Sequence, residues 1–271
     1  MIEPRAALEA IGRLPDAEID IAGAALQLAR VDASDADWQA AREHLSQIAR
    51  DAVALSKAKN LERRADLLGG LLSLQHGFGG DTQTYDDLSN ANLIRVIQRR
   101  RGLPVALGII WLHAARAAGW EAHGLDFPAH FLVGLAGRGT QVVIDPFHAG
   151  IPLDSSLLQK LLKRFEGEAA ELRPGLLRPM SQRRVLLRLQ NNIVTRRLET
   201  GDLAGALSCT EDMLRIAPDE AELWRQAAAV NQRLGEIGAA LDCYERCLLL
   251  LPTGGAADRV RAAMQELRGK L

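Results

Sequence analysis

Apolar residues recur at three- and four-residue steps through the first hundred residues, and this spacing predicts helices. One such stretch covers residues 38–58, after a serine and aspartates that can cap a helix start. A second stretch covers residues 61–74, and a further helix is expected to open at Ser89 or Asn90. The N-terminal third of the chain is therefore expected to be helical.

The pattern changes in the middle of the chain. An apolar helix is expected over 105–118, with Gly119 as its stop signal, and a later helix over 155–165. A glycine-rich turn at residues 137–140 predicts a hairpin, and the glycines and prolines of 166–179 predict a linker. The expected strands are 121–127, 131–135 and 141–145.

The last third contains an internal repeat with a period of 34 residues. Seven residues recur at that offset, among them Gly201 and Gly235, Cys209 and Cys243. The period and the helix–turn–helix spacing resemble the tetratricopeptide repeat, whose concave surface commonly binds peptide segments. We therefore expect a protein or peptide partner at the repeats, and a final helix over 256–271. The cysteines at the repeated positions are expected to pack in the core.

Composition and charge exclude several classes of protein. The chain has 271 residues, 48% of them hydrophobic, with a formal net charge of −1, so no overall field favours nucleic acid. A first arginine cluster at residues 95–101 is expected to complement the end of a helix and to pair with nearby acids. A second basic stretch at residues 183–197 is expected to be a solvated face, because it lacks interleaved aromatic residues for base stacking. Neither a secretory signal nor an apolar run near the ~20 residues of a membrane span is visible. The expected location is the cytoplasm, with no membrane or nucleic-acid partner.

One histidine and one aspartate of the expected hairpin could form a chemical unit. If the turn occupies residues 137–140, Leu132 faces Asp145, and His130 becomes a diagonal neighbour of Asp145 on the same face. Diagonal neighbours lie roughly 7–8 Å apart at Cα, which permits a side-chain hydrogen bond. An aspartate bound to one imidazole nitrogen leaves the other nitrogen available as a base. The same residues could equally be a half-buried histidine and a turn-capping aspartate.

Several short motifs together resemble a known family. They are Phe78-Gly79-Gly80-Asp81, Tyr85-Asp86-Asp87, Asn92-Leu93, Arg99-Arg100-Arg101-Gly102-Leu103-Pro104, Phe127-Pro128-Ala129-His130-Phe131-Leu132 and Ile144-Asp145-Pro146-Phe147. Residues 30–180 with these motifs resemble the SirB-type transglutaminase-like family, in which such a domain is joined to tetratricopeptide repeats.

The resemblance implies a fold class and a domain organisation. The implied fold is α+β and mostly helical, with a transglutaminase-like (papain-like) core and a small antiparallel sheet, followed by an α-helical repeat region. The implied domains are residues 1–178, with a helical N-terminal segment, and residues 179–271.

The resemblance also implies a site, with one departure. His130 and Asp145 match catalytic positions of the enzyme superfamily, whereas Pro104 stands where those enzymes carry the cysteine nucleophile. The helix that begins at Pro104 would supply the third corner of the site. No cysteine precedes Cys209, so a neighbouring residue cannot replace the nucleophile. The further pocket candidates are Arg101, Gly102, Pro104 and Phe147.

Two functions remain open at this point. The leading one is a non-catalytic protein that binds a partner through its repeats. The alternative is a hydrolase or transferase without a cysteine nucleophile, with His130 as general base and Asp145 as its orienting group. We expect no cofactor and no metal site, because the possible ligands lack a compact spacing. Those possible ligands are His113, His123, His130, Asp145 and His148.

Overall fold

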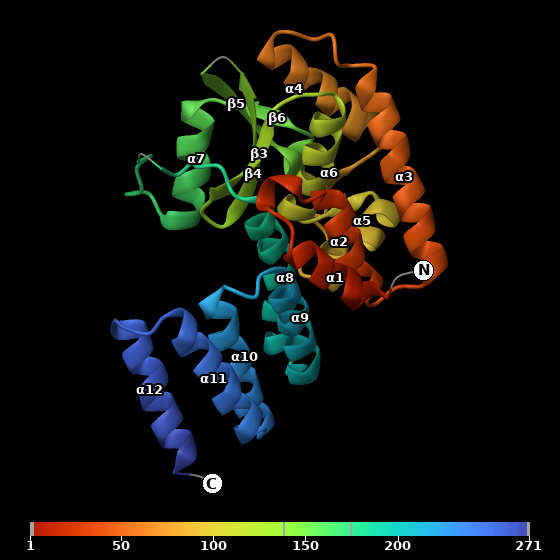
Figure 1. Cartoon of the computed structure of the whole chain (residues 1–271). Coiled ribbons are helices and arrows are strands. Elements are labelled where there is room, and N and C mark those ends of the chain that lie inside the picture. Colours follow the sequence, from red (N-terminus) through yellow and green to blue (C-terminus); the bar gives the residue numbers. More distant parts are fainter. Residues whose placement is uncertain (1–2, 138, 174, 270–271) are drawn as a thin grey trace. The chain divides into compact units, whose positions relative to one another are not determined.

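A computed structural model describes residues 3–137, 139–173 and 175–269. The chain forms two compact units, one of Pro15–Leu189 and one that joins Met1–Leu14 to Gln190–Leu271 (Figure 1). These units differ from the expected domains 1–178 and 179–271 in two respects. The N-terminal helix belongs with the repeats, and helix α8 (Gln182–Glu199) runs across the boundary. The expected domain limits themselves stay a prediction.

The unit Pro15–Leu189 is mostly helical, as the apolar spacing predicted. Ser34 caps α3 (Asp35–Val53) by accepting a hydrogen bond from the backbone N–H of Asp37. The helix expected at Ser89 or Asn90 instead begins after Asn92, because a short 3-10 helix occupies residues 88–90. Its helices are α2 (Ile21–Arg30), α3 (Asp35–Val53), α4 (Leu61–Gly69, continued by a π-helical turn), α5 (Leu93–Arg99), α6 (Pro104–Ala117) and α7 (Ser155–Glu166), with the first part of α8.

A four-stranded antiparallel sheet lies in the same unit, in the order β3-β4-β5-β6. Val133 pairs with Ile144 and Gly137 with Thr140, which confirms the predicted hairpin register. The strands are β3 (Ala122–Phe127), β4 (His130–Gly137), β5 (Thr140–Asp145) and β6 (Ile151–Leu153), and β1 (Gly79–Gly80) and β2 (Arg101–Gly102) form a separate parallel pair. The strands β1, β2 and β6 were not predicted, because they are too short to show a period-2 pattern.

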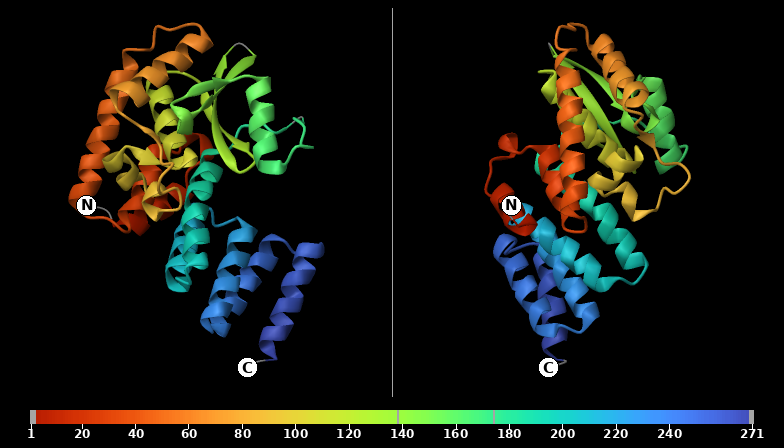
Figure 2. Two further views of the ribbon diagram at one scale, coloured as in Figure 1. Left: turned by 180° about the vertical axis from the view of Figure 1, so that it is seen from behind. Right: turned by 90° about the vertical axis from the view of Figure 1, so that its right-hand side faces the viewer.

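Helices cover both faces of the four-stranded sheet. The ring of Phe131 lies so close to Gly108 of α6 that a Cβ there would meet it at 2.2 Å. Leu132, the next residue of β4, belongs to the opposite face and packs in a core cluster with Leu158 and Leu162 of α7. Figures 1 and 2 show α7 beside the strands. Because side chains alternate along a strand, His130 shares the α7 face with Leu132.

The second unit contains the repeats. Helix α10 (Ala221–Leu234) packs against both α9 (Leu203–Ile216) and α11 (Ile237–Leu250), and α11 against α12 (Gly255–Arg268). Helix α1 (Pro4–Gly12) packs on α9, where Arg5 pairs with the buried Asp212 at 3.1 Å. The repeat glycines Gly201 and Gly235 have φ values of +79° and +81°, so each turn uses a conformation that favours glycine.

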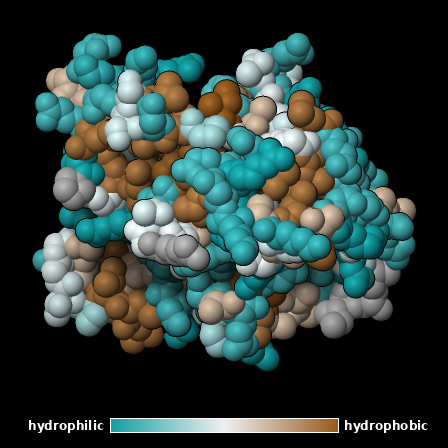
Figure 3. Space-filling model, turned by 90° about the horizontal axis from the view of Figure 1, so that it is seen from above, coloured by the Kyte–Doolittle hydropathy of each residue, from teal (hydrophilic) through white to brown (hydrophobic). Residues whose placement is uncertain are grey.

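The surface mixes polar and apolar residues. Seen from above, hydrophobic residues reach the surface in separate groups between hydrophilic ones (Figure 3). Among the large apolar side chains that the structure describes, Leu74 and Leu249 are the most exposed, at 86% and 71%. Among the residues that the structure describes, no helix combines the length and apolar character needed to cross a membrane.

Candidate functional site

His130 and Asp145 form the predicted pair. The Nε2 atom of His130 lies 3.0 Å from Oδ2 of Asp145, and both side chains are buried, at 5% and 2% exposure. The hairpin register sets this contact, because it places both residues on the α7 face at neighbouring strand ends. The contact leaves Nδ1 of His130 outside the pair, which is the arrangement a general base requires.

Asp145 also caps a turn. Its Oδ1 accepts a hydrogen bond of 2.9 Å from the backbone N–H of Phe147, which caps the 3-10 turn Pro146–His148. Burial alone raises the pKa of Asp145, but the hydrogen bonds and charges of His130 and His148 outweigh it, so the pKa lies below its ordinary value. The aspartate is therefore an ionised group at the centre of a hydrogen-bonded cluster, and also the turn cap that the alternative interpretation named.

A second histidine completes this cluster. The Nδ1 atom of His148 lies 2.7 Å from the same Oδ2 of Asp145, and its side chain is 48% exposed. From the sequence, His148 was expected only as one of several dispersed metal ligands. The signal that could have found it is the Asp-Pro-x-His spacing, because a turn beginning at Asp145 brings residues i and i+3 together.

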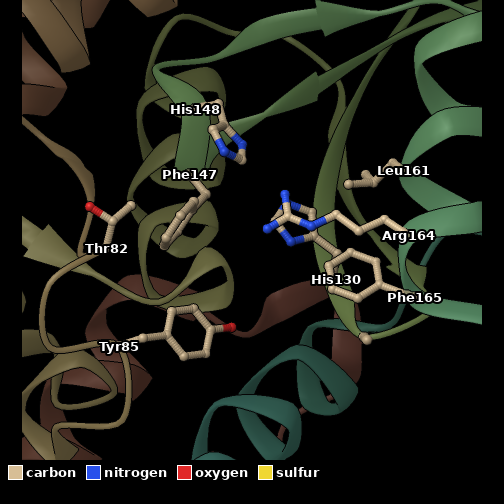
Figure 4. A pocket seen from close by; sticks show the side chains of 9 residues that line it. Thr82, Tyr85, His130, Phe147, His148, Leu161, Arg164 and Phe165 are labelled. Carbon is tan, nitrogen blue, oxygen red and sulfur yellow. The ribbon is translucent and has the colours of Figure 1, made fainter.

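A cavity of about 460 Å³ lies beside the cluster (Figure 4). Leu161, Arg164 and Phe165 of α7 line one side, and the ring of Phe165 stacks on His130 with centroids 6.0 Å apart. Phe147 stands edge-on to His130, with a centroid distance of 6.2 Å. The remaining lining residues are Thr82, Tyr85, Ala129 and His148. His130 is thus buried yet borders a cavity that a small molecule or a side chain could occupy.

Of the pocket candidates, Phe147 lines this cavity, and Arg101, Gly102 and Pro104 do not. Arg101 is exposed and donates to the backbone oxygens of Gly77 and Arg100. Pro104 is the buried first residue of α6, as expected for a helix start. Helix α6 packs against β4 and the turn Pro146–His148, but Pro104 is not among the residues that line this cavity, so the third corner that the resemblance implies stays a prediction.

Two arginines near the site were not predicted. Arg188 of α8 donates to the backbone oxygen of His130 at 2.6 Å and pairs with Asp126, so it holds the end of β4 in place. Arg164 lines the cavity and makes no hydrogen bond or ion pair with any residue that the structure describes. Only the second basic stretch around residues 183–197 hinted at Arg188, and no sequence signal singled out Arg164.

The other candidates lie elsewhere. His113 contacts the backbone oxygen of Leu45 at 3.0 Å, and His123 is half-buried on β3. In the first arginine cluster, Arg95 pairs with Asp37 and Arg99 with Asp81. The buried positions of Cys209 and Cys247 agree with core packing, and burial raises the pKa of Cys247.

Comparison with known proteins agrees with this architecture. The profile of the transglutaminase-like superfamily matches residues 39–191, and that of the tetratricopeptide repeat matches residues 196–265. A UPF0162 protein of Xylella fastidiosa strain Temecula1 is 32% identical over 194 residues, which cover 70% of this chain and 69% of the relative. A UPF0162 protein of Vibrio cholerae serotype O1 is 27% identical over 216 residues, or 79% and 80% of the two chains.

A shorter match extends to a mammalian protein. F-box only protein 21 of Mus musculus is 31% identical over 68 residues, which cover 25% of this chain and 11% of that protein. The long bacterial matches and the superfamily profile together identify the chain. It belongs to the transglutaminase-like superfamily and to the family of UPF0162 proteins, with tetratricopeptide repeats after the transglutaminase-like region.

Proposed function

We propose that this protein binds another protein through its tetratricopeptide repeats and performs no thiol chemistry. The observation that carries the proposal is the repeat unit itself, with matched helices α9, α10 and α11 and the closing helix α12. Repeats of this kind use their surfaces to bind peptide segments of other proteins. The transglutaminase-like region then acts as a scaffold with a binding cavity.

The missing thiol supports the non-catalytic part of the proposal. No cysteine precedes Cys209, and all three cysteines lie on α9 and α11 of the repeats. Burial raises the pKa values of Cys243 and Cys247, which lowers the fraction of reactive thiolate. We further assign the chain to the SirB-type group, since the motifs from Phe78 to Phe147 and the joined repeats fit that group together.

The exposed charges of the central helix α10 offer a direct test. The double variant Arg225→Glu/Arg233→Glu reverses two exposed charges there, and Lys57→Glu/Lys59→Glu makes the same charge change far away in sequence, after α3. Immobilised full chain captures partners, which mass spectrometry identifies, and calorimetry then measures the affinity of each purified partner. We expect the α10 variant to weaken binding about tenfold or more and the control to leave it unchanged. A partner that binds both variants equally, but is lost in Arg164→Ala, would place binding in the cavity instead.

A second function has one observation in its favour. The 3.0 Å contact between His130 and Asp145 at the edge of a cavity is the geometry of an oriented general base. We propose as the alternative a hydrolase or transferase in which His130 activates water or a substrate nucleophile. A panel of ester and amide substrates tests it. Activity that disappears in His130→Ala and persists in the α10 double variant would favour the enzyme, and a uniformly inactive panel favours the interaction protein.

A further inference from the structure

The cluster around Asp145 has the composition of a metal site. The atoms Nε2 of His130, Oδ2 of Asp145 and Nδ1 of His148 all lie within 4.8 Å of one another. The two contacts to Oδ2 measure 3.0 and 2.7 Å. When ligand atoms each lie about 2.0–2.2 Å from one zinc ion, their distances from one another are not much longer than these two contacts. The side chains would therefore need to move little to admit an ion.

The ligand types favour a particular class of ion. Two imidazole nitrogens and one carboxylate oxygen suit zinc and its neighbours among the divalent transition metals, whereas calcium and magnesium prefer oxygen ligands alone. Three protein ligands leave at least one coordination position open. Here that position would face the cavity, because His130 and His148 both line it.

The surroundings of the ligands support the same conclusion. The backbone N–H of Phe147 binds Oδ1 of Asp145, so the carboxylate is already oriented with Oδ2 toward both histidines. Such outer contacts orient metal ligands before the ion arrives. The half-exposed side chain of His148 provides a route of entry, whereas His130 and Asp145 are buried.

A second histidine–carboxylate pair in the molecule can be compared with the proposed site. The pair His76–Asp51 also measures 3.0 Å, but the neighbouring His44 makes its contact with Arg100 and not with that carboxylate. One histidine and one carboxylate are too few ligands for a tight site.

Arg164 lines the cavity and its positive charge opposes a bare cation, so an anionic group at the open position would accompany the ion.

We propose that His130, Asp145 and His148 bind one divalent transition-metal ion of the zinc class, with an open coordination position toward the cavity. This differs from the sequence-based expectation of no metal. Linear spacing links only Asp145 and His148, through the turn that Asp145 caps, whereas His130 reaches the site from the neighbouring strand.

The test uses the untagged full chain, stripped with a chelator and then titrated with zinc chloride in a calorimeter. We expect binding of one ion per chain, with affinity about tenfold or more lower in His148→Ala and Asp145→Asn. His76→Ala is the matched control and should bind zinc as the unmodified chain does. Because His148 is half-exposed, its variant should fold, and circular dichroism checks this.

A second measurement identifies the ligands. Cobalt(II) in the stripped chain should give visible absorption bands of a four- or five-coordinate ion, and these should be lost in His148→Ala and retained in His76→Ala. Absence of stoichiometric zinc binding would overturn the proposal. So would equal loss of affinity in the His148 and His76 variants. Neither outcome bears on the repeats, so the proposed protein binding is tested separately.

Discussion

Replacing Asp145 by asparagine is the sharpest perturbation of the site, because the two side chains have nearly the same shape. The carboxylate is 2% exposed and accepts hydrogen bonds from His130, His148 and the backbone of Phe147. Asparagine keeps one oxygen, which can still accept from Phe147. Its amide nitrogen then faces the two histidines, and the charge that they stabilise is gone.

The size of the effect follows from these contacts. A hydrogen bond to a charged group contributes about 1.5–3 kcal/mol, and two such contacts are weakened. The neutral amide also avoids the burial cost that raises the pKa of Asp145, which offsets part of the loss. We therefore expect Asp145→Asn to lower the free energy of unfolding by about 2–3 kcal/mol. His148→Ala should cost about 1 kcal/mol, because that side chain is 48% exposed.

Urea unfolding at neutral pH, with a chelator present, measures these differences. The control is Asp154→Asn, because Asp154 caps α7 through a 2.8 Å hydrogen bond from the N–H of Leu157 and asparagine caps helices equally well. Its change should stay below about 0.5 kcal/mol. The double variant Asp145→Asn/His148→Ala should lose less than the sum of the single losses, since both remove one contact. Strict additivity, or a loss below about 1 kcal/mol in Asp145→Asn, would refute the reasoning.

Three further predictions concern the frame of the site. Gly150→Ala should destabilise the chain by about 2–4 kcal/mol in urea unfolding, because φ is +76° and the new Cβ would lie 1.9 Å from the ring of Trp111; a loss below about 1 kcal/mol would contradict the close contact. Burial, with the charges of Arg100 and His76, lowers the pKa of His44 to about 4. Unfolded chains therefore bind more protons between pH 6.5 and 4, and stability falls as the pH drops through that range. Relative to His44→Gln, the unmodified chain should lose about 2–3 kcal/mol of unfolding free energy over that range, and parallel pH profiles would contradict this. Pro104→Cys should give a thiol whose alkylation rate does not change in His130→Ala, and a drop in that rate would place the two residues together.

The hairpin shows why part of the site could be predicted from sequence. A short turn fixes which residues pair, and the side-chain period of two then fixes which residues share a face. Leu132, His130 and Asp145 therefore followed from the position of Gly137 and Thr140, and the pairs in β4 and β5 confirm that register. The limits of α6 and α7 were also predicted within one residue, since proline and glycine mark the ends of one and the cap Asp154 precedes the other.

The face of the sheet that each helix covers could not be predicted in the same way. It depends on long-range packing, such as the fit of the Phe131 ring against Gly108, and no local pattern encodes that contact. The resemblance to thiol enzymes suggested that α6 would supply the third corner beside His130. In the structure α7 contributes Leu161, Arg164 and Phe165 to the cavity, and α6 packs against the turn Pro146–His148, so the third corner stays a prediction. The helix α7 was predicted from the sequence, but its contribution to the cavity was not.

The physical question that remains is why a His–Asp pair persists where no nucleophile accompanies it. A purely structural role accounts for the pair, because Asp145 caps a turn and its buried charge would be uncompensated without His130 and His148. A purely structural role does not account for the cavity or for Arg164, whose guanidinium lines that cavity and makes no ion pair with the described residues. Apart from the ring of Phe165, which lies 5.9 Å from it, the guanidinium of Arg164 has no charged or hydrogen-bonding partner among the described residues, and this setting beside two histidines fits an anionic group supplied from outside the chain. The cavity, rather than the pair, is therefore the feature that separates a binding site from a purely structural hydrogen-bond cluster.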